Sequence, residues 1–68
     1  MMNYEEIDQY RIIDYMIAVG GDVAVDDIIA FSGAEKLRVY PLIFKMKLDG
    51  VITITETNMW GAPTKIRL

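Results

Sequence analysis

The sequence predicts one mainly α-helical domain, in which three helices are followed by a two-stranded β-hairpin. Its 68 residues allow a single domain, residues 1–68, with one small core. A hydrophobic content of 53% indicates a packed chain rather than a disordered one. Apolar residues recur at helical spacing as far as Gly50 and alternate after it, which predicts helices first and strands last.

The first predicted helix begins after Asn3 and ends at Gly20-Gly21. Asn3 is a good N-cap, and Glu6 three residues later completes a capping box. A hydrophobic staple is expected between Met2 and Ile7, on either side of the cap. The residues expected at helical spacing along this helix are Ile7, Tyr10, Ile13 and Ile17.

The following segment predicts the first half of a helix-turn-helix. Residues 22–25 are expected to form an extended link. A short helix then runs from Asp27 to about Phe31 and is buried through Ile28 and Phe31. Gly33 supplies the turn after it, and two short helices joined by such a turn are typical of a helix-turn-helix.

The third predicted helix starts near Arg38 and runs to about Leu48. Pro41 cannot donate a hydrogen bond to the carbonyl of Leu37, so either the helix starts late, with Pro41 in its first turn, or it kinks at Pro41. The late start is the expected arrangement. The inward stripe is expected to consist of Val39, Ile43 and Met46, with Leu42 at its margin.

Gly50 ends the third helix, and a hairpin follows. In residues 51–55 the isoleucines are expected to point inward and the threonines outward, and residues 64–68 alternate in the same way with Ile66 and Leu68 inward. Residues 57–63 are turn-prone. The predicted core contains Ile7, Ile13, Ile17, Ile28, Phe31, Val39, Ile43, Met46, Ile52, Ile54 and Ile66.

Charge is distributed unevenly along the chain. The net charge of −3 and the low pI argue against nucleic acid as a partner of the whole chain. Residues 1–33 contain seven acidic residues and one arginine, a net charge of −6, whereas residues 34–68 contain six basic and three acidic residues, a net charge of +3. This split indicates that the C-terminal half has a face with its own partner.

Two segments carry a family resemblance. Residues 39–52 read Val-Tyr-Pro-Leu-Ile-Phe-Lys-Met-Lys-Leu-Asp-Gly-Val-Ile, and residues 61–68 read Gly-Ala-Pro-Thr-Lys-Ile-Arg-Leu. They resemble the recognition helix and the wing, a β-hairpin, of winged helix-turn-helix regulators, most closely the PadR family. The resemblance implies a DNA-binding transcriptional regulator. The chain departs from the family at Phe44 and Leu48, where related sequences tend to carry charge, and at Thr64, where the family pattern is basic.

The first functional hypothesis is binding to double-stranded DNA, with the third helix in the major groove and the wing beside the backbone. Arg38 would read a base through its planar fork, the other basic residues would contact phosphates, and Tyr40 could donate its hydroxyl to a phosphate. The alternative for these side chains is an ordinary solvated face. The candidate residues are Lys36, Arg38, Tyr40, Lys45, Lys65 and Arg67.

The second hypothesis is a protein-docking module without DNA binding. Its candidate contacts are Phe44, Leu48, Met59 and Trp60. Two other interpretations stay open here: Tyr40, Phe44 and Leu48 could pack into the core, and Trp60 could fold back onto the hairpin or enter a minor groove.

Self-association, most simply a homodimer, is expected because a short apolar chain without cysteine lacks other means of stabilisation. The candidate surfaces are Tyr4, Tyr10 and Tyr15 of the first helix and the stripe from Phe44 to Leu48.

Composition argues against catalysis. The chain has no cysteine and no histidine, so a thiol nucleophile, an imidazole base and the usual metal ligands are missing. No enzyme activity, cofactor or metal is expected. No apolar run approaches the roughly 18 residues of a membrane span, and the acidic N-terminus does not resemble a signal peptide. We therefore expect a cytoplasmic protein with no membrane partner.

Overall fold

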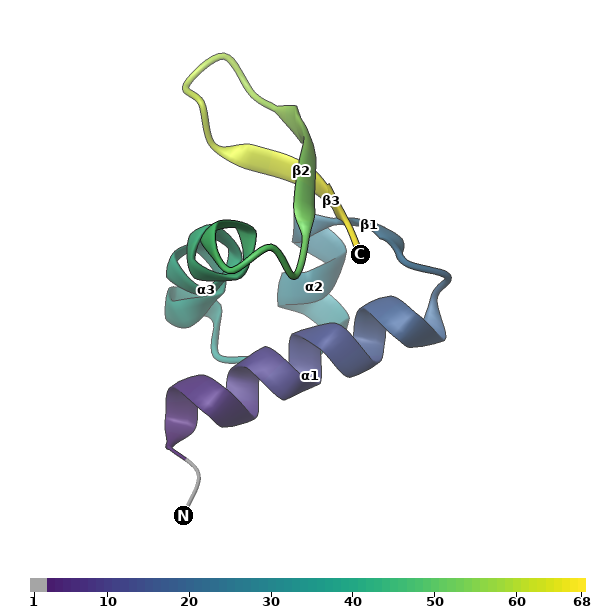
Figure 1. Ribbon diagram of the computed structural model, residues 1–68, viewed down its shortest axis with the longest axis vertical. Coiled ribbons are helices and arrows are strands. Elements are labelled where there is room, and N and C mark those ends of the chain that lie inside the picture. Colours follow the sequence, from purple (N-terminus) through teal and green to yellow (C-terminus); the bar gives the residue numbers. More distant parts are fainter. Residues whose placement is uncertain (1–2) are drawn as a thin grey trace.

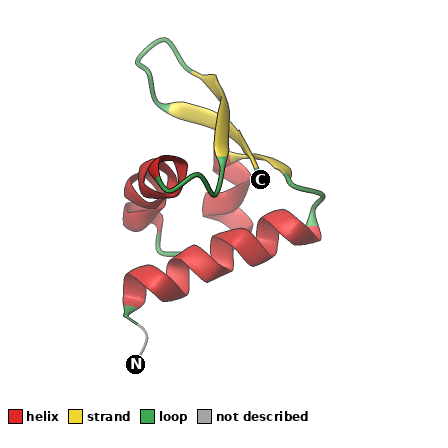
Figure 2. Cartoon of the chain, in the orientation of Figure 1, coloured by secondary structure: helices red, strands yellow, loops and turns green. Residues whose placement is uncertain are grey.

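The computed structural model describes residues 3–68 as three helices and a three-stranded antiparallel sheet (Figure 1). The elements are α1 (Tyr4–Ala18), β1 (Asp22–Ala24), α2 (Val25–Phe31), α3 (Lys36–Leu48), β2 (Thr53–Thr57) and β3 (Pro63–Arg67). The helices lie together, and the β2–β3 hairpin rises from them on the side away from α1 (Figure 2). The predicted order of three helices and a hairpin is therefore confirmed.

Helix α1 begins where the sequence predicts but faces the core with a different stripe. The side chain of Asn3 accepts a hydrogen bond from the Glu6 amide at 2.8 Å, as expected for an N-cap. The buried residues are Ile12 and Met16, whereas Ile17 is 62% exposed. The expected Met2 staple lies outside the described residues.

The predicted phase of α1 is wrong because the helix carries apolar residues on two neighbouring stripes. Ile7 is half-buried, Ile13 packs only at the edge of the core, and Tyr10 is exposed. Asp8 is buried one turn before Ile12 and pairs with Arg38 of α3. The side of α1 that faces the core is therefore the side that carries Asp8 and Ile12, and not the predicted side.

The first three residues of the expected link, Asp22–Ala24, form strand β1, which makes the sheet three-stranded rather than a two-stranded wing. Strand β1 pairs with β3, which pairs in turn with β2. Val23 lies opposite Ile66, and the amide of Leu68 donates to the carbonyl of Gly21 at 2.9 Å. Val23 and Val25 both point inward, so this short segment gains burial as well as backbone hydrogen bonds.

Helix α2 begins at Val25, two residues before the predicted start at Asp27, and only part of its predicted inner face is buried. Val25 and Ile28 are buried, whereas Phe31 is exposed and lies against the ring of Tyr15, with 6.5 Å between ring centroids. The expectation that Phe31 belongs to the core is therefore wrong.

Helix α3 begins at Lys36 rather than near Arg38. The side chain of Glu35 caps it by accepting from the Leu37 amide at 2.8 Å, so Pro41 lies in the helix interior. Pro41 and Leu37 are on the exposed side, where water can satisfy the carbonyl that Pro41 leaves without a donor. The inner stripe is Val39, Leu42, Ile43 and Met46, each at most 1% exposed, so Leu42 is central rather than marginal.

The β2–β3 hairpin packs its apolar side chains against the core. Ile52 and Ile66 are buried, and Ile54, opposite Ile66, is partly buried against them. The register of β2 against β3 shifts between Ile54 and Thr57. Leu68 is exposed rather than inward, because the chain leaves β3 at Arg67.

The phase of α1 can be tested with a matched pair of isoleucines. Ile12→Val should lower the free energy of unfolding by about 1 kcal/mol, because it removes a methyl group from a filled site. Ile17→Val should change it by less than about 0.5 kcal/mol, because that side chain is mostly exposed. Chemical denaturation followed by circular dichroism measures both values. Equal effects would contradict the observed phase.

Candidate macromolecule-binding face

The exposed side of α3 carries an apolar line along its middle. With the inner stripe buried, Leu37, Pro41, Phe44 and Leu48 follow one another at helical spacing on the opposite side; we call these four residues the α3 outer stripe. Leu37 is 82%, Phe44 45% and Leu48 84% exposed. The interpretation that Phe44 and Leu48 pack into the core is therefore wrong, and Tyr40, next to the stripe, is also partly exposed.

Basic side chains border the α3 outer stripe instead of occupying its middle. A turn of 100° per residue places Lys36 and Lys47 on the Tyr40 side of the stripe, and Arg38 and Lys45 on the other side. Lys47, Leu37 and Pro41 were not among the candidate site residues that the sequence suggested. An earlier helix start would have revealed Leu37, because it lies seven residues before Phe44.

Arg38, the expected base reader, is held by α1. Its Nη1 donates to Asp8 Oδ2 at 2.9 Å, and its guanidinium lies over the ring of Tyr4, 5.3 Å from the centroid. Asp8 is 3% exposed, so its carboxylate depends on this partner. Arg11 supports the pair from a greater distance, 3.8 Å from Asp8 Oδ1, and donates to the carbonyl of Gly33. Arg38 therefore joins helices rather than presenting a free fork.

The hydrogen bond from Arg38 to Asp8 raises the pKa of Arg38 above its ordinary value. A raised pKa favours the charged form in the folded state. The stabilisation that Arg38 supplies is thus present below the ordinary arginine range and is lost only as the pH rises through the raised pKa. Arg38 remains charged at every pH at which the protein can be studied.

Two other candidate cations are also paired. Lys45 Nζ lies 3.7 Å from Asp49, and Lys65 Nζ lies 3.3 Å from Glu56 across the hairpin. Within residues 3–68, Lys36, Lys47 and Arg67 have no ion-pair partner. The structure therefore brings the expected basic residues to α3 and β3 but leaves few of them unengaged.

The turn between β2 and β3 presents two large apolar side chains. The side-chain oxygen of Asn58 accepts hydrogen bonds from the backbone amides of Trp60 and Ala62 at 2.9 and 3.0 Å. The backbone amide of Asn58 donates to the carbonyl of Ala62. Met59 is 87% and Trp60 85% exposed, so Trp60 does not fold back onto the hairpin. We call Met59 and Trp60 the wing tip. Residues 57–64 contain no charged side chain.

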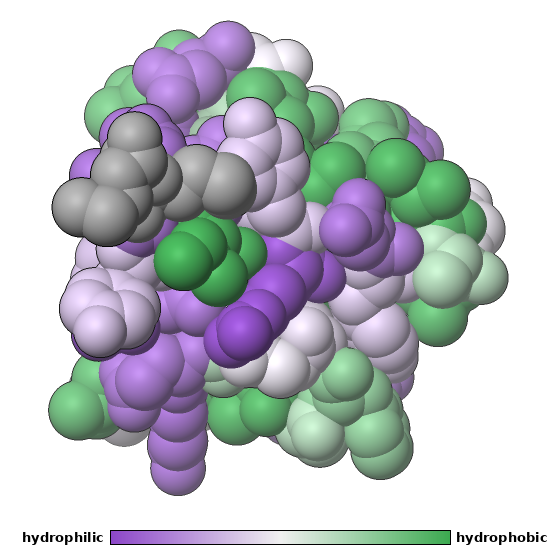
Figure 3. Space-filling view, turned by 90° about the horizontal axis from the view of Figure 1, so that it is seen from below, coloured by the Kyte–Doolittle hydropathy of each residue, from purple (hydrophilic) through white to green (hydrophobic). Residues whose placement is uncertain are grey.

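The exposed side of α1 is acidic and apolar. Figure 3 looks onto the molecule from this side: hydrophilic side chains dominate the left and centre, and apolar ones are prominent on the right, toward the C-terminal end of α1. A shallow groove lined by Glu6, Gln9, Tyr10 and Lys45 lies between α1 and α3. The exposed side of α1 and the exposed side of α3 therefore meet along this groove.

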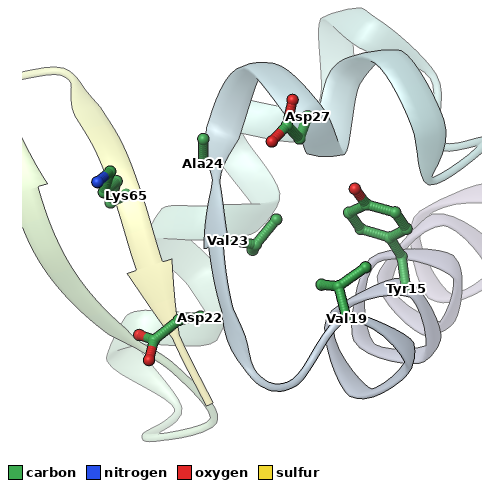
Figure 4. Close-up of a pocket in the computed structure, with 7 residues that line it drawn as sticks. All are labelled: Tyr15, Val19, Asp22, Val23, Ala24, Asp27 and Lys65. Carbon is green, nitrogen blue, oxygen red and sulfur yellow. The ribbon is translucent and has the colours of Figure 1, made fainter.

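A hollow beside β1 is lined by residues of four elements, Lys65 of β3 among them. It lies among α1, β1 and α2, and Figure 4 shows Tyr15, Val19 and Val23 on one side of β1, with Asp22 and Lys65 on the other. Its polar groups do not converge on one point. Among residues 3–68, no group of three or more possible metal ligands is found.

Comparison with known proteins gives no match: no family model fits the chain, and no curated protein or solved structure is significantly similar to it. None of the helices in residues 3–68 has the length and apolar character needed to cross a membrane.

The role of Arg38 can be tested with a double-mutant cycle. Asp8→Asn and Arg38→Met should each lower the Tm, and the double variant should lose less than the sum, because either change alone breaks the same contact. Arg11→Met, which removes the more distant partner of Asp8, should have a smaller effect. Thermal unfolding followed by circular dichroism gives these values. Strict additivity of the two changes would show that Asp8 and Arg38 are not coupled.

Proposed function

We propose that this chain is a winged-helix module that binds another polypeptide through the α3 outer stripe and the wing tip. The winged-helix assignment is supported by a helix pair followed directly by a hairpin. The resemblance of residues 39–52 and 61–68 to PadR regulators points to the same fold. The assignment makes α3 the helix that would contact a partner.

The observation that carries the proposal is the exposed apolar middle of α3. Apolar patches of this kind on a small domain typically mark sites of protein interaction. Leu37, Phe44 and Leu48 form an apolar centre, and the lysines beside them form a polar rim, which is the usual composition of a protein interface. Trp60 adds an aromatic anchor of the type that dominates interface energies, and the hydrogen-bonded turn that holds it reduces the ordering cost of binding.

DNA binding in a transcriptional regulator is the second candidate. It is favoured by the exposed, unpaired Lys36, Lys47 and Arg67 among the described residues, which could contact phosphates together with Lys45 and Lys65. The arguments against it are the apolar middle of α3, which would face the base edges, and the engagement of Arg38 by Asp8. The net charge of −3 also argues against DNA binding.

A photoreactive amino acid placed at Leu48 tests the docking proposal in cells. Leu48 lies in the α3 outer stripe, and Asp26, exposed on α2, is the matched control position. We expect a discrete protein adduct from position 48, its yield reduced by Phe44→Glu, and none from position 26. Adducts with nucleic acid, or equal labelling from both positions, would contradict the proposal.

The two candidate functions differ in their response to salt. About four or five phosphate contacts would give DNA binding a log–log slope near −4 against salt concentration, whereas the docking proposal predicts no salt-sensitive binding to random duplex. Fluorescence anisotropy at low ionic strength measures this. Should binding occur, Lys36→Glu with Lys47→Glu is the suitable loss-of-binding variant, because both side chains are exposed and unpaired among the described residues. A charge reversal at Arg38 would instead disturb Asp8.

A further inference from the structure

We infer that the polypeptide that covers the α3 outer stripe is helix α1 of a second copy of this chain. This inference rests on the proposed docking function and names its partner. It starts from a second exposed apolar stripe, on α1, which lies on a helix of similar length to α3 and is bordered by charges of the opposite sign.

Helix α1 has an apolar line on its solvent side. Tyr10 and Ile17 lie seven residues apart, both more than half exposed, on the side of α1 away from Ile12 and Met16. Ile13 lies beside this line and is half-buried. We call Tyr10 and Ile17 the α1 outer stripe. Within residues 3–68, the rest of the chain leaves Tyr10 57% and Ile17 62% exposed.

The charges beside the two outer stripes have opposite signs. Glu6 and Asp14 lie on either side of the α1 outer stripe, both exposed and without an ion-pair partner in the described chain. The α3 outer stripe is bordered on one side by Lys36 and Lys47, which have no ion-pair partner in the described chain, and on the other by Lys45, which lies 3.7 Å from Asp49. When the apolar lines face each other, acidic rims therefore meet basic rims, and complementary potentials of this kind favour one pairing over others.

Charge also disfavours the symmetric pairings of like helices. Two copies joined through their α3 helices would bring Lys36, Lys45 and Lys47 of both chains together, and two copies joined through α1 would do the same with Glu6 and Asp14. Each arrangement buries apolar side chains at the cost of like-charge repulsion. The pairing of α1 with α3 of another copy avoids that cost.

The two helices also match in length. Helix α1 has 15 residues and α3 has 13, or about 22 and 20 Å at 1.5 Å per residue. The groove lined by Glu6, Tyr10 and Lys45 lies where the two exposed faces meet, so a second copy can approach both faces from one side. A 68-residue chain with no cysteine belongs to the size class in which association commonly adds stability.

Sedimentation of the full chain and three kinds of variant tests the inference. The wild-type chain should exceed its monomer mass of 7.8 kDa as its concentration rises. Leu48→Glu on α3 and Ile17→Lys on α1 should each sediment as monomers, because each places a repelling charge within an outer stripe. Ala30→Glu and Ala30→Lys, on the exposed side of α2, carry the same charges elsewhere and should behave as wild type. Circular dichroism shows that each variant is folded.

Mixing the two monomeric variants identifies the pairing. The Leu48→Glu copy keeps an intact α1 and the Ile17→Lys copy keeps an intact α3, so an equimolar mixture should form a 1:1 dimer. A Leu48→Glu copy that still dimerises alone, or a mixture that stays monomeric although wild type associates, would overturn the inference.

A wild-type chain that remains monomeric at every concentration would also overturn the inference, and would do so separately from the docking proposal. In that case an adduct from position 48 with a protein other than this chain would still support docking. The absence of any protein adduct would contradict both the docking proposal and the inference that a second copy is the partner.

Discussion

The structure depends on the contact between Asp8 of α1 and Arg38 of α3. A buried carboxylate requires a partner, and the distance of 2.9 Å between Arg38 Nη1 and Asp8 Oδ2 fixes how these two helices face each other. That orientation turns Ile12 and Met16 of α1 inward and leaves Tyr10 and Ile17 in solvent. The same contact engages the arginine that a DNA-binding interpretation needs most.

Local signals in the sequence predict the elements that depend on neighbouring residues. The cap at Asn3, the period change at Gly50 and the inner stripe of α3 are all observed, because each is determined within a few residues. The phase of α1 is not local: Ile13 and Ile17 are as apolar as Ile12 and Met16. Ile12 and Met16 lie on the side of α1 that also carries Asp8, and the partner of Asp8, Arg38, is 30 residues away in the sequence. Likewise, β1 is a strand only because β3 lies beside it.

Only part of the candidate site was predictable from the sequence. Phe44, Leu48, Met59 and Trp60 were named from the sequence because large apolar residues at such positions are unusual, and all four are exposed. Leu37 was missed because Pro41 suggests a later helix start, whereas the Glu35 cap starts the helix at Lys36. Caps formed by glutamate are less common than those by serine, threonine, aspartate or asparagine, so this start is hard to recognise.

The arrangement of charge and apolar surface explains how an acidic chain can carry a basic half. On α3 the lysines lie at the rim, where charge steers encounter and excludes wrong partners but adds little to affinity. The apolar middle lies where buried area contributes most. A phosphate-binding helix has the reverse requirement, with charge toward the ligand and apolar groups toward the core. Leu37, Phe44 and Leu48 occupy the exposed middle of α3, so the proposal pairs the basic rim of α3, in a segment of net charge +3, with the acidic rim of α1.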